Sequence, residues 1–172
     1  EESNEEFFYN PFWSQVVQGF STTISNAGSL PLLLVRPRSG TENSVFTTLL
    51  KGKIDALAVL SWHAPTSDIS SNLDPKIPTI VVGDFGKSIN SSHVDVDNVK
   101  GGFLAAEHLI AAGCKNILAL TGDLRLQSGR DRLEGYKKAL TSSGLKVRED
   151  MILRGDYTSV TARDLTAGAI KK

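Results

Sequence analysis

The chain has 172 residues, of which 40% are hydrophobic and 22% charged, a composition typical of one globular domain or two small ones. Its 19 Lys and Arg residues balance 19 Asp and Glu residues without forming a basic cluster, so this stretch alone lacks the positive surface that DNA phosphates require. The single cysteine, Cys114, excludes an internal disulfide and a cysteine-rich metal site, and no apolar run approaches the roughly 20 residues of a membrane span.

The opening residues, EESNEE, are acidic, whereas a secretory signal begins with basic residues. A single cysteine also fits a reducing compartment. The sequence therefore predicts a cytoplasmic protein without a membrane partner.

The first predicted element is a helix in NPFWSQVVQGFSTTISNAG, from Asn10 to Gly28. Asn10 is a suitable N-cap, and Pro11 fits the first helical position because that position needs no backbone N–H. Apolar residues recur on one face from Trp13 onwards, and Gly28 is a typical helix terminator.

After this helix, short apolar runs alternate with segments of helical period, a pattern that predicts βαβ units around parallel sheets. The predicted strands are residues 30–35, 54–60, 79–83, 92–97, 116–122 and 151–156. The predicted helices are residues 41–52, 98–113 and 129–144, with Asn98 as the cap of the second, and a last helix starts at Thr158. Because the pattern opens on a helix and stops inside one, we expect an α/β fold truncated at both ends.

Polar and aromatic side chains follow the predicted strands. In open parallel sheets, ligands bind beyond the carboxyl ends of the strands, where helix N-termini converge. Aromatic rings there cover the apolar faces of a sugar or nucleoside, while Asp, Asn and Arg bond its hydroxyls or ring nitrogens. The residues in such positions are Asn10, Phe12, Trp13, Ser61, Trp62, Gly83, Asp84, Phe85, Asp97, Asn98, Gly122, Asp123, Gly155, Asp156 and Tyr157.

Five segments together carry a family resemblance through essentially the whole chain. They are NPFW at residues 10–13, IPTIVVGD at 77–84, VDVDNVKGGFLAAEHLIAAGCKNILALTGD at 94–123, SGRDRLEGYKKAL at 128–140 and GDYT at 155–158. Each is weak alone, but their order and spacing are specific. The chain resembles the effector-binding domain of the lactose repressor and purine repressor family of transcriptional regulators.

The resemblance implies a two-lobed α/β fold of the periplasmic-binding-protein type, with parallel sheets flanked by helices and crossing strands between the lobes. Residues 1–97 would form the first lobe without its first strand, and residues 98–172 an incomplete second lobe. A small polar effector, a carbohydrate or a purine, would bind between the lobes without any cofactor. The family also implies a homodimer that reaches operator DNA through a helix-turn-helix headpiece before residue 1.

Ligand contacts carry over first to the N-terminal lobe. Phe12 and Trp13 match the pair after Asn-Pro that lines the cleft. Asp84 matches a polar contact at a strand end, although Gly83 stands where some members have the carboxylate. Asp97 lies where the chain crosses to the second lobe.

The second lobe supplies three more candidates. Ser128 and Arg132 precede the Gly-Tyr pair, in the segment whose arginine reaches the ligand in this family, and Tyr157 matches an aromatic residue that stacks on it. The family's later contacts, an Asn-Asp pair and a further Asp, would lie beyond Lys172. Cys114 stands where the family usually has His, a difference that concerns packing.

Taken without the resemblance, each of these residues has an ordinary structural interpretation. The two aromatic residues after Asn-Pro would belong to the core. Arg132 would be a solvated helix residue paired with Asp131 or Glu134. Tyr157 would anchor a loop.

The sequence motifs give little support for metal binding or catalysis. Asp95, Asp97 and Asn98 suggest a calcium loop, but Val99 stands where the next oxygen ligand belongs. The three histidines share no ligand spacing, and no Walker, GxGxxG or GxSxG motif occurs. We therefore expect no metal and no enzyme activity. Two alternatives stay open: a periplasmic sugar-binding protein of a transport system, which shares the fold, and a small α/β enzyme of unfamiliar mechanism.

Overall fold

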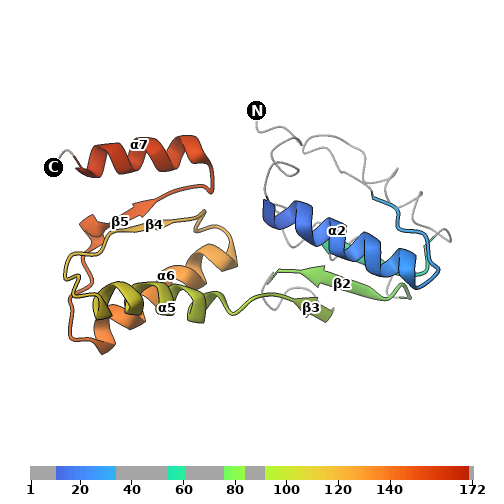
Figure 1. Cartoon of the computed structure of the whole chain (residues 1–172), viewed down its shortest axis with the longest axis horizontal. Coiled ribbons are helices and arrows are strands. Elements are labelled where there is room, and N and C mark those ends of the chain that lie inside the picture. The colour runs from blue at the N-terminus through green and yellow to red at the C-terminus, as the bar shows by residue number, and fades with distance from the viewer. Residues whose placement is uncertain (1–10, 34–53, 61–75, 84–91, 171–172) are drawn as a thin grey trace. The chain divides into compact units, whose positions relative to one another are not determined.

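The computed structural model describes residues 11–33, 54–60, 76–83 and 92–170 (Figure 1). The chain divides into two compact units, residues 1–53 and 54–172, which we describe separately. The predicted boundary between lobes at residue 97 concerns the complete protein and stays a prediction.

In the first unit, the described part is helix α2 (Pro11–Asn26) and the residues that follow it. The helix begins at Pro11 as predicted. It ends where Gly28 adopts a φ of 78° and the backbone N–H of Ser29 reaches back to the carbonyl of Ile24 at 3.1 Å. Gly28 therefore terminates α2 because an L side chain disfavours this left-handed conformation.

The predicted buried strand at residues 30–35 is wrong for residues 30–33, which belong to no strand. Leu30 is 94% exposed and Leu32 69% exposed. Pro31 has no backbone N–H to donate to a neighbouring strand, so an apolar run containing it is a poor inner strand. The predicted helix at 41–52 lies outside the described residues.

The second unit contains a three-stranded sheet of β1 (Leu57–Leu60), β2 (Thr79–Val82) and β3 (Ser92–Val94) in the order β1-β2-β3. Both pairs are parallel, with Val81 opposite Val59 on one side and His93 on the other. Val81 is 2% exposed at the centre. The predicted parallel arrangement is confirmed, although each strand is shorter than its apolar run.

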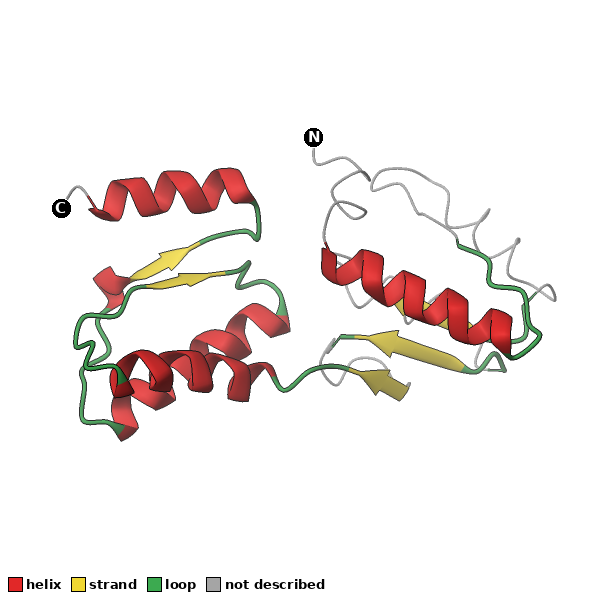
Figure 2. Cartoon of the chain, viewed as in Figure 1, coloured by secondary structure: helices red, strands yellow, loops and turns green. Residues whose placement is uncertain are grey.

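The same unit contains strands β4 (Ala119–Thr121) and β5 (Ile152–Arg154), which pair in parallel. Helices α5 (Asn98–Ala111) and α6 (Gln127–Ser142) lie on one side of these strands and α7 (Ser159–Ile170) on the other, as Figure 2 shows. A short 3-10 helix, η2 (Glu149–Met151), precedes β5. These helices and strands agree with their predictions to within a few residues.

A hydrophobic core joins α5 and α6 to the two strands. Its buried members are Ala106, Ile117, Tyr136, Ala139, Leu140 and Ile152. The hydroxyl of Tyr136 donates to the carbonyl of Ile117 at 2.8 Å, which satisfies the ring's only polar group. Burial raises the pKa of Tyr136 above its ordinary value of 10.0.

Two glycines let α5 and α6 cross closely. A Cβ at Gly102 would overlap the carbonyl oxygen of Arg132, and one at Gly135 would overlap that of Val99. Gly101 differs, because nothing lies within 4 Å of the place where its Cβ would be. The crossing therefore requires glycine at 102 and 135 but not at 101.

Helix α5 has a different cap from the one expected. The carboxylate of Asp97 accepts from the backbone N–H of Lys100 at 2.8 Å, so Asp97 is the N-cap and Asn98 is the first helical residue. Pattern alone cannot separate these neighbours because both side chains are good caps. No helix in the described ranges combines the length and apolar character that crossing a membrane requires.

Candidate functional site at the ends of β4 and β5

The candidate site lies where β4 and β5 end. Because the two strands are parallel neighbours, the loops after them leave the same edge of the sheet. Gly122 follows β4 directly, and Tyr157 lies in the loop between β5 and α7. The first turn of α5 and the first two turns of α6 supply the remaining side chains.

Tyr157 has an unusual backbone. Its φ of 71° makes it the one non-glycine residue with a positive φ among those described. Its ring lies against Gly122, where any Cβ would overlap it, and its hydroxyl is 3.2 Å from the hydroxyl of Ser128. A left-handed conformation is costly for a bulky residue, and such strain is often found at ligand sites.

Arg132 joins Tyr157 from α6. The guanidinium carbon lies 6.0 Å from the centroid of the Tyr157 ring, at the outer limit of a cation–π contact. Its Nε donates to the side-chain oxygen of Asn98 at 2.8 Å. Ser128, Arg132 and Tyr157, which the family resemblance marks in two separate segments, therefore come together in one cluster with Asn98 and Gly122.

Asp97 and Asn98 border a second feature, an open hollow of about 550 Å³ along residues 93–99 with Asp131 at its side. Asp97 is exposed and uses its carboxylate to cap α5. Asn98 is 4% exposed and faces Arg132 instead. Asp97, which was predicted to contact the ligand, is therefore the sequence neighbour of the cluster residue Asn98, while its own carboxylate caps α5.

Two carboxylates hold the loops that carry the cluster. Asp123 is 6% exposed and accepts from the backbone N–H and the guanidinium of Arg125. Asp156 accepts from the backbone N–H of Thr158 at 2.9 Å and from the hydroxyls of Thr158 and Thr161, both at 2.8 Å. These hydrogen bonds hold the pKa of Asp156 below its ordinary value of 3.8, and the bond from the Thr158 N–H has the largest effect. Burial acts in the opposite direction.

This lowered pKa makes the start of α7 sensitive to acid. Because the folded pKa lies below the ordinary one, the carboxylate contributes stability above pH 3.8 that is lost as the pH falls through the folded value. Asp156→Asn is expected to reduce the free energy of unfolding by about 1 kcal/mol near neutral pH, and the difference from wild type should shrink in acid. Urea unfolding of both proteins from pH 7 to pH 3 measures this difference in the free energy of unfolding. A difference that stays constant with pH would contradict the stabilising role of the Asp156 carboxylate.

Gly122 provides the space for the Tyr157 ring. In Gly122→Ala, the new methyl group is expected to push the ring away and break its hydrogen bond to Ser128. The free energy of unfolding should fall by about 1–3 kcal/mol, as in other overpacked sites. Urea unfolding tests this. Tyr157→Phe is the control: it removes the hydroxyl alone and should lower the free energy of unfolding by about 1 kcal/mol. Equal stability of Gly122→Ala and wild type would show that the ring is not confined.

The other predicted site residues belong to the first unit or lie outside the described ranges. Phe12 and Trp13 belong to α2 in the first unit, where their rings meet edge to face with centroids 5.0 Å apart. Phe12 is 49% exposed, whereas Trp13 is 8% exposed. Asp84 lies outside the described residues. The roles of all three in binding stay predictions.

Sequence reasoning did not select Asn98 and Gly122 as site residues, although both were among the strand-end positions. Gly122 contributes by having no side chain, and only the position of the Tyr157 ring makes this visible. Asn98 was interpreted as a helix cap. Its adjacency to the arginine depends on how α5 crosses α6, which no local pattern encodes.

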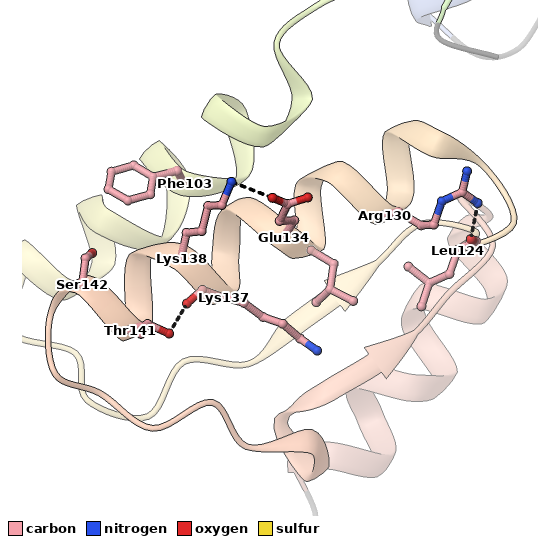
Figure 3. A pocket seen from close by; sticks show the side chains of 9 residues that line it. Phe103, Leu124, Arg130, Glu134, Lys137, Lys138, Thr141 and Ser142 are labelled. Carbon is pink, nitrogen blue, oxygen red and sulfur yellow. Dashed lines mark hydrogen bonds and ion pairs between the residues drawn. The ribbon is translucent and has the colours of Figure 1, made fainter. Parts of the chain in front are cut away.

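A groove on another face of α6 has a volume of about 710 Å³ (Figure 3). Its lining residues are Phe103, Leu124, Arg130, Leu133, Glu134, Lys137, Lys138, Thr141 and Ser142. Its cations have partners: Lys138 pairs with Glu134 at 2.6 Å, and Arg130 donates to the carbonyl of Leu124. None of the cluster's side chains lines this groove, so it is a separate surface feature.

The cluster's chemistry is that of recognition. An aromatic face, a guanidinium and a hydroxyl can together cover and hydrogen-bond a small polar molecule. Within the described part of the chain, no group of three or more His, Cys, Asp and Glu residues is placed to hold a metal ion.

Comparison with known proteins identifies the family. The model for periplasmic binding proteins and the sugar-binding domain of the LacI family matches residues 6–171. The chain therefore belongs to this family as a LacI-type effector-binding domain, which confirms the resemblance predicted from its motifs.

The relatives are transcriptional regulators. The HTH-type transcriptional regulator CelR of Thermobifida fusca is 30% identical over 161 residues, which cover 91% of this chain and 47% of CelR. The ribose operon repressor of Escherichia coli is 32% identical over 152 residues, which cover 86% of this chain and 46% of the repressor. This chain thus spans about half the length of these relatives.

Solved structures agree with the fold. A complex of the transcriptional regulator CelR with cellobiose is 29% identical, with a TM-score of 0.79 over 99% of this chain and 54% of that one. A putative LacI regulator from Bacillus cereus, 22% identical, has a TM-score of 0.81 over 99% of this chain and 61% of its own. The predicted periplasmic-binding-protein-like α/β fold is confirmed.

Proposed function

We propose that this chain is the effector-sensing core of a homodimeric, cytoplasmic LacI-type regulator and that it binds a sugar. The observation that carries the proposal is the cluster in which Tyr157, held at a φ of 71°, meets Arg132 and Ser128 at the carboxyl ends of two parallel strands. An exposed guanidinium beside an aromatic ring suits a molecule with hydroxyl groups and apolar ring faces. The described complex of CelR with cellobiose supports a carbohydrate over a purine.

The proposed action is a shift of equilibrium without chemical change. A sugar that binds one arrangement of the lobes more tightly than another raises the population of that arrangement. In the full-length dimer this change would alter the spacing of two DNA-binding headpieces, and DNA binding would alter sugar affinity by the same factor. The relatives' names as regulators, not enzymes, support this non-catalytic role.

The test uses the full-length protein. A melting-temperature screen with cellobiose, ribose, other mono- and disaccharides, and purine nucleosides should find a sugar that stabilises the protein, by about 2.7 kcal/mol when its concentration is 100 times Kd. Binding to DNA selected from a random library should then change when that sugar is added. Stabilisation by nucleosides alone would overturn the sugar assignment, and turnover of a bound sugar would overturn the regulator.

A further inference from the structure

Asn98 connects Arg132 to the segment between β3 and α5. Asn98 is 4% exposed, and its Oδ1 accepts from Nε of Arg132 at 2.8 Å. Its Nδ2 donates to the carboxylate of Asp95 at 3.2 Å and to the carbonyl of Val96 at 3.1 Å. Both the donor and the acceptor ends of the amide are therefore in use.

These partners require an amide. The guanidinium must meet an acceptor, whereas the carboxylate of Asp95 and the carbonyl of Val96 must meet donors. An aspartate at this position would place a second carboxylate beside Asp95 and would donate nothing when ionised. An alanine would remove all three hydrogen bonds. Asparagine presents a donor group and an acceptor in fixed directions.

The bond to Asn98 also determines which edge of Arg132 stays available. It occupies Nε, and within the described ranges no hydrogen bond is made by Nη1 or Nη2. Arg132 as a whole is exposed. The forked outer edge of the guanidinium, which suits two oxygen acceptors side by side, is thus not occupied by a hydrogen bond to any described residue, and the guanidinium lies beside the Tyr157 ring.

We propose that Asn98 is the positioning residue of the effector site: it fixes the direction of Arg132 and couples the arginine to the linking segment of residues 95–97. That segment has its own local order, since Asp95 accepts from the N–H of Val96 at 2.7 Å and Asp97 caps α5. A sugar that pulls on Arg132 therefore acts, through one side chain, on the connection between β3 and α5. The coupling to a sugar rests on the proposed function.

The first experiment needs no ligand. Full-length protein labelled with ¹⁵N-arginine reports exchange of the Arg132 Nε–H with water by NMR. Asn98→Ala should accelerate this exchange by about tenfold or more, because the hydrogen bond that protects it is lost. Ala106→Gly is the matched control, since it weakens α5 at another buried position without touching Arg132. Its Nε–H exchange should stay close to that of wild type.

The second experiment measures coupling in the reverse direction. Arg132→Met removes an exposed head group and leaves Asn98 in place, so the variant should fold. Hydrogen exchange of the backbone amides at residues 95–98 should then accelerate by about threefold or more, while α7 amides are unchanged. This variant also tests the proposal if Asn98→Ala proves too unstable to study.

Cellobiose titration of the same variants links positioning to binding. Asn98→Ala should weaken cellobiose affinity by about tenfold and Ala106→Gly by less than about twofold. Unchanged Nε–H exchange in Asn98→Ala, or unchanged exchange at residues 95–98 in Arg132→Met, would overturn the proposal. Faster exchange with unaltered cellobiose affinity would also overturn it. If wild-type protein does not bind cellobiose, that result counts against the sugar assignment, and the two exchange measurements alone decide the role of Asn98.

Discussion

Replacing Arg132 with alanine is expected to weaken sugar affinity of the full-length protein by about 100-fold or more, while the fold is kept. A charge-assisted hydrogen bond contributes about 1.5–3 kcal/mol, and the outer edge of this guanidinium can make two. Each 1.4 kcal/mol corresponds to about a tenfold change in Kd. Because Arg132 is exposed, its loss should keep the fold, and the melting temperature of the unliganded protein should fall only by the cost of the lost hydrogen bond to Asn98.

The same helix offers a matched control for this experiment. Arg130 belongs to α6 but directs its guanidinium to the backbone carbonyls of Leu124 and Arg125, outside the cluster. Arg130→Ala should therefore keep the wild-type sugar affinity in calorimetric titration. If Arg132→Ala binds as tightly as Arg130→Ala, then Arg132 is not part of the site, and the cluster loses its main polar contact.

The second large effect is expected at the crossing of α5 and α6. Gly102→Ala should lower the free energy of unfolding by about 2 kcal/mol, because overpacking costs about 1–3 kcal/mol and the backbone carbonyl of Arg132 cannot move aside as a side chain would. The neighbouring Gly101→Ala should raise it by about 0.5–1 kcal/mol, since alanine favours a helix and open space receives its methyl group.

Urea unfolding of the two variants measures this difference. They change adjacent residues by the same methyl group in the same helix, so intrinsic helix propensity is matched between them. The opposite signs then report the tertiary contact alone. Two alanine variants of equal stability would mean that the helices separate freely and that the crossing is not tight.

Local patterns predicted the elements whose formation depends on local chemistry. Pro11 and Gly28 bound α2, and the short apolar runs became parallel strands, because these signals act within a few residues. Residues 30–33 failed because an apolar run resembles a buried strand wherever it occurs, while burial depends on the rest of the fold. Tertiary context, not composition, decides such segments.

The candidate site shows the same division. Ser128, Arg132 and Tyr157 were found because the family's motifs mark them, and the structure brings them together. Asn98 and Gly122 were not predicted as site residues because each contributes only through a residue that is distant in the sequence. One is defined by the arginine it meets on another helix, the other by the ring that its missing side chain admits.

The contact between Gly122 and Tyr157 has a consequence for how the protein can evolve. The ring fills the volume that a side chain at position 122 would occupy, so the two positions share one space. A larger residue at 122 is compatible with this backbone only when residue 157 becomes smaller. Homologous sequences should therefore show covariation between these two distant positions, with change at either one constrained by the other.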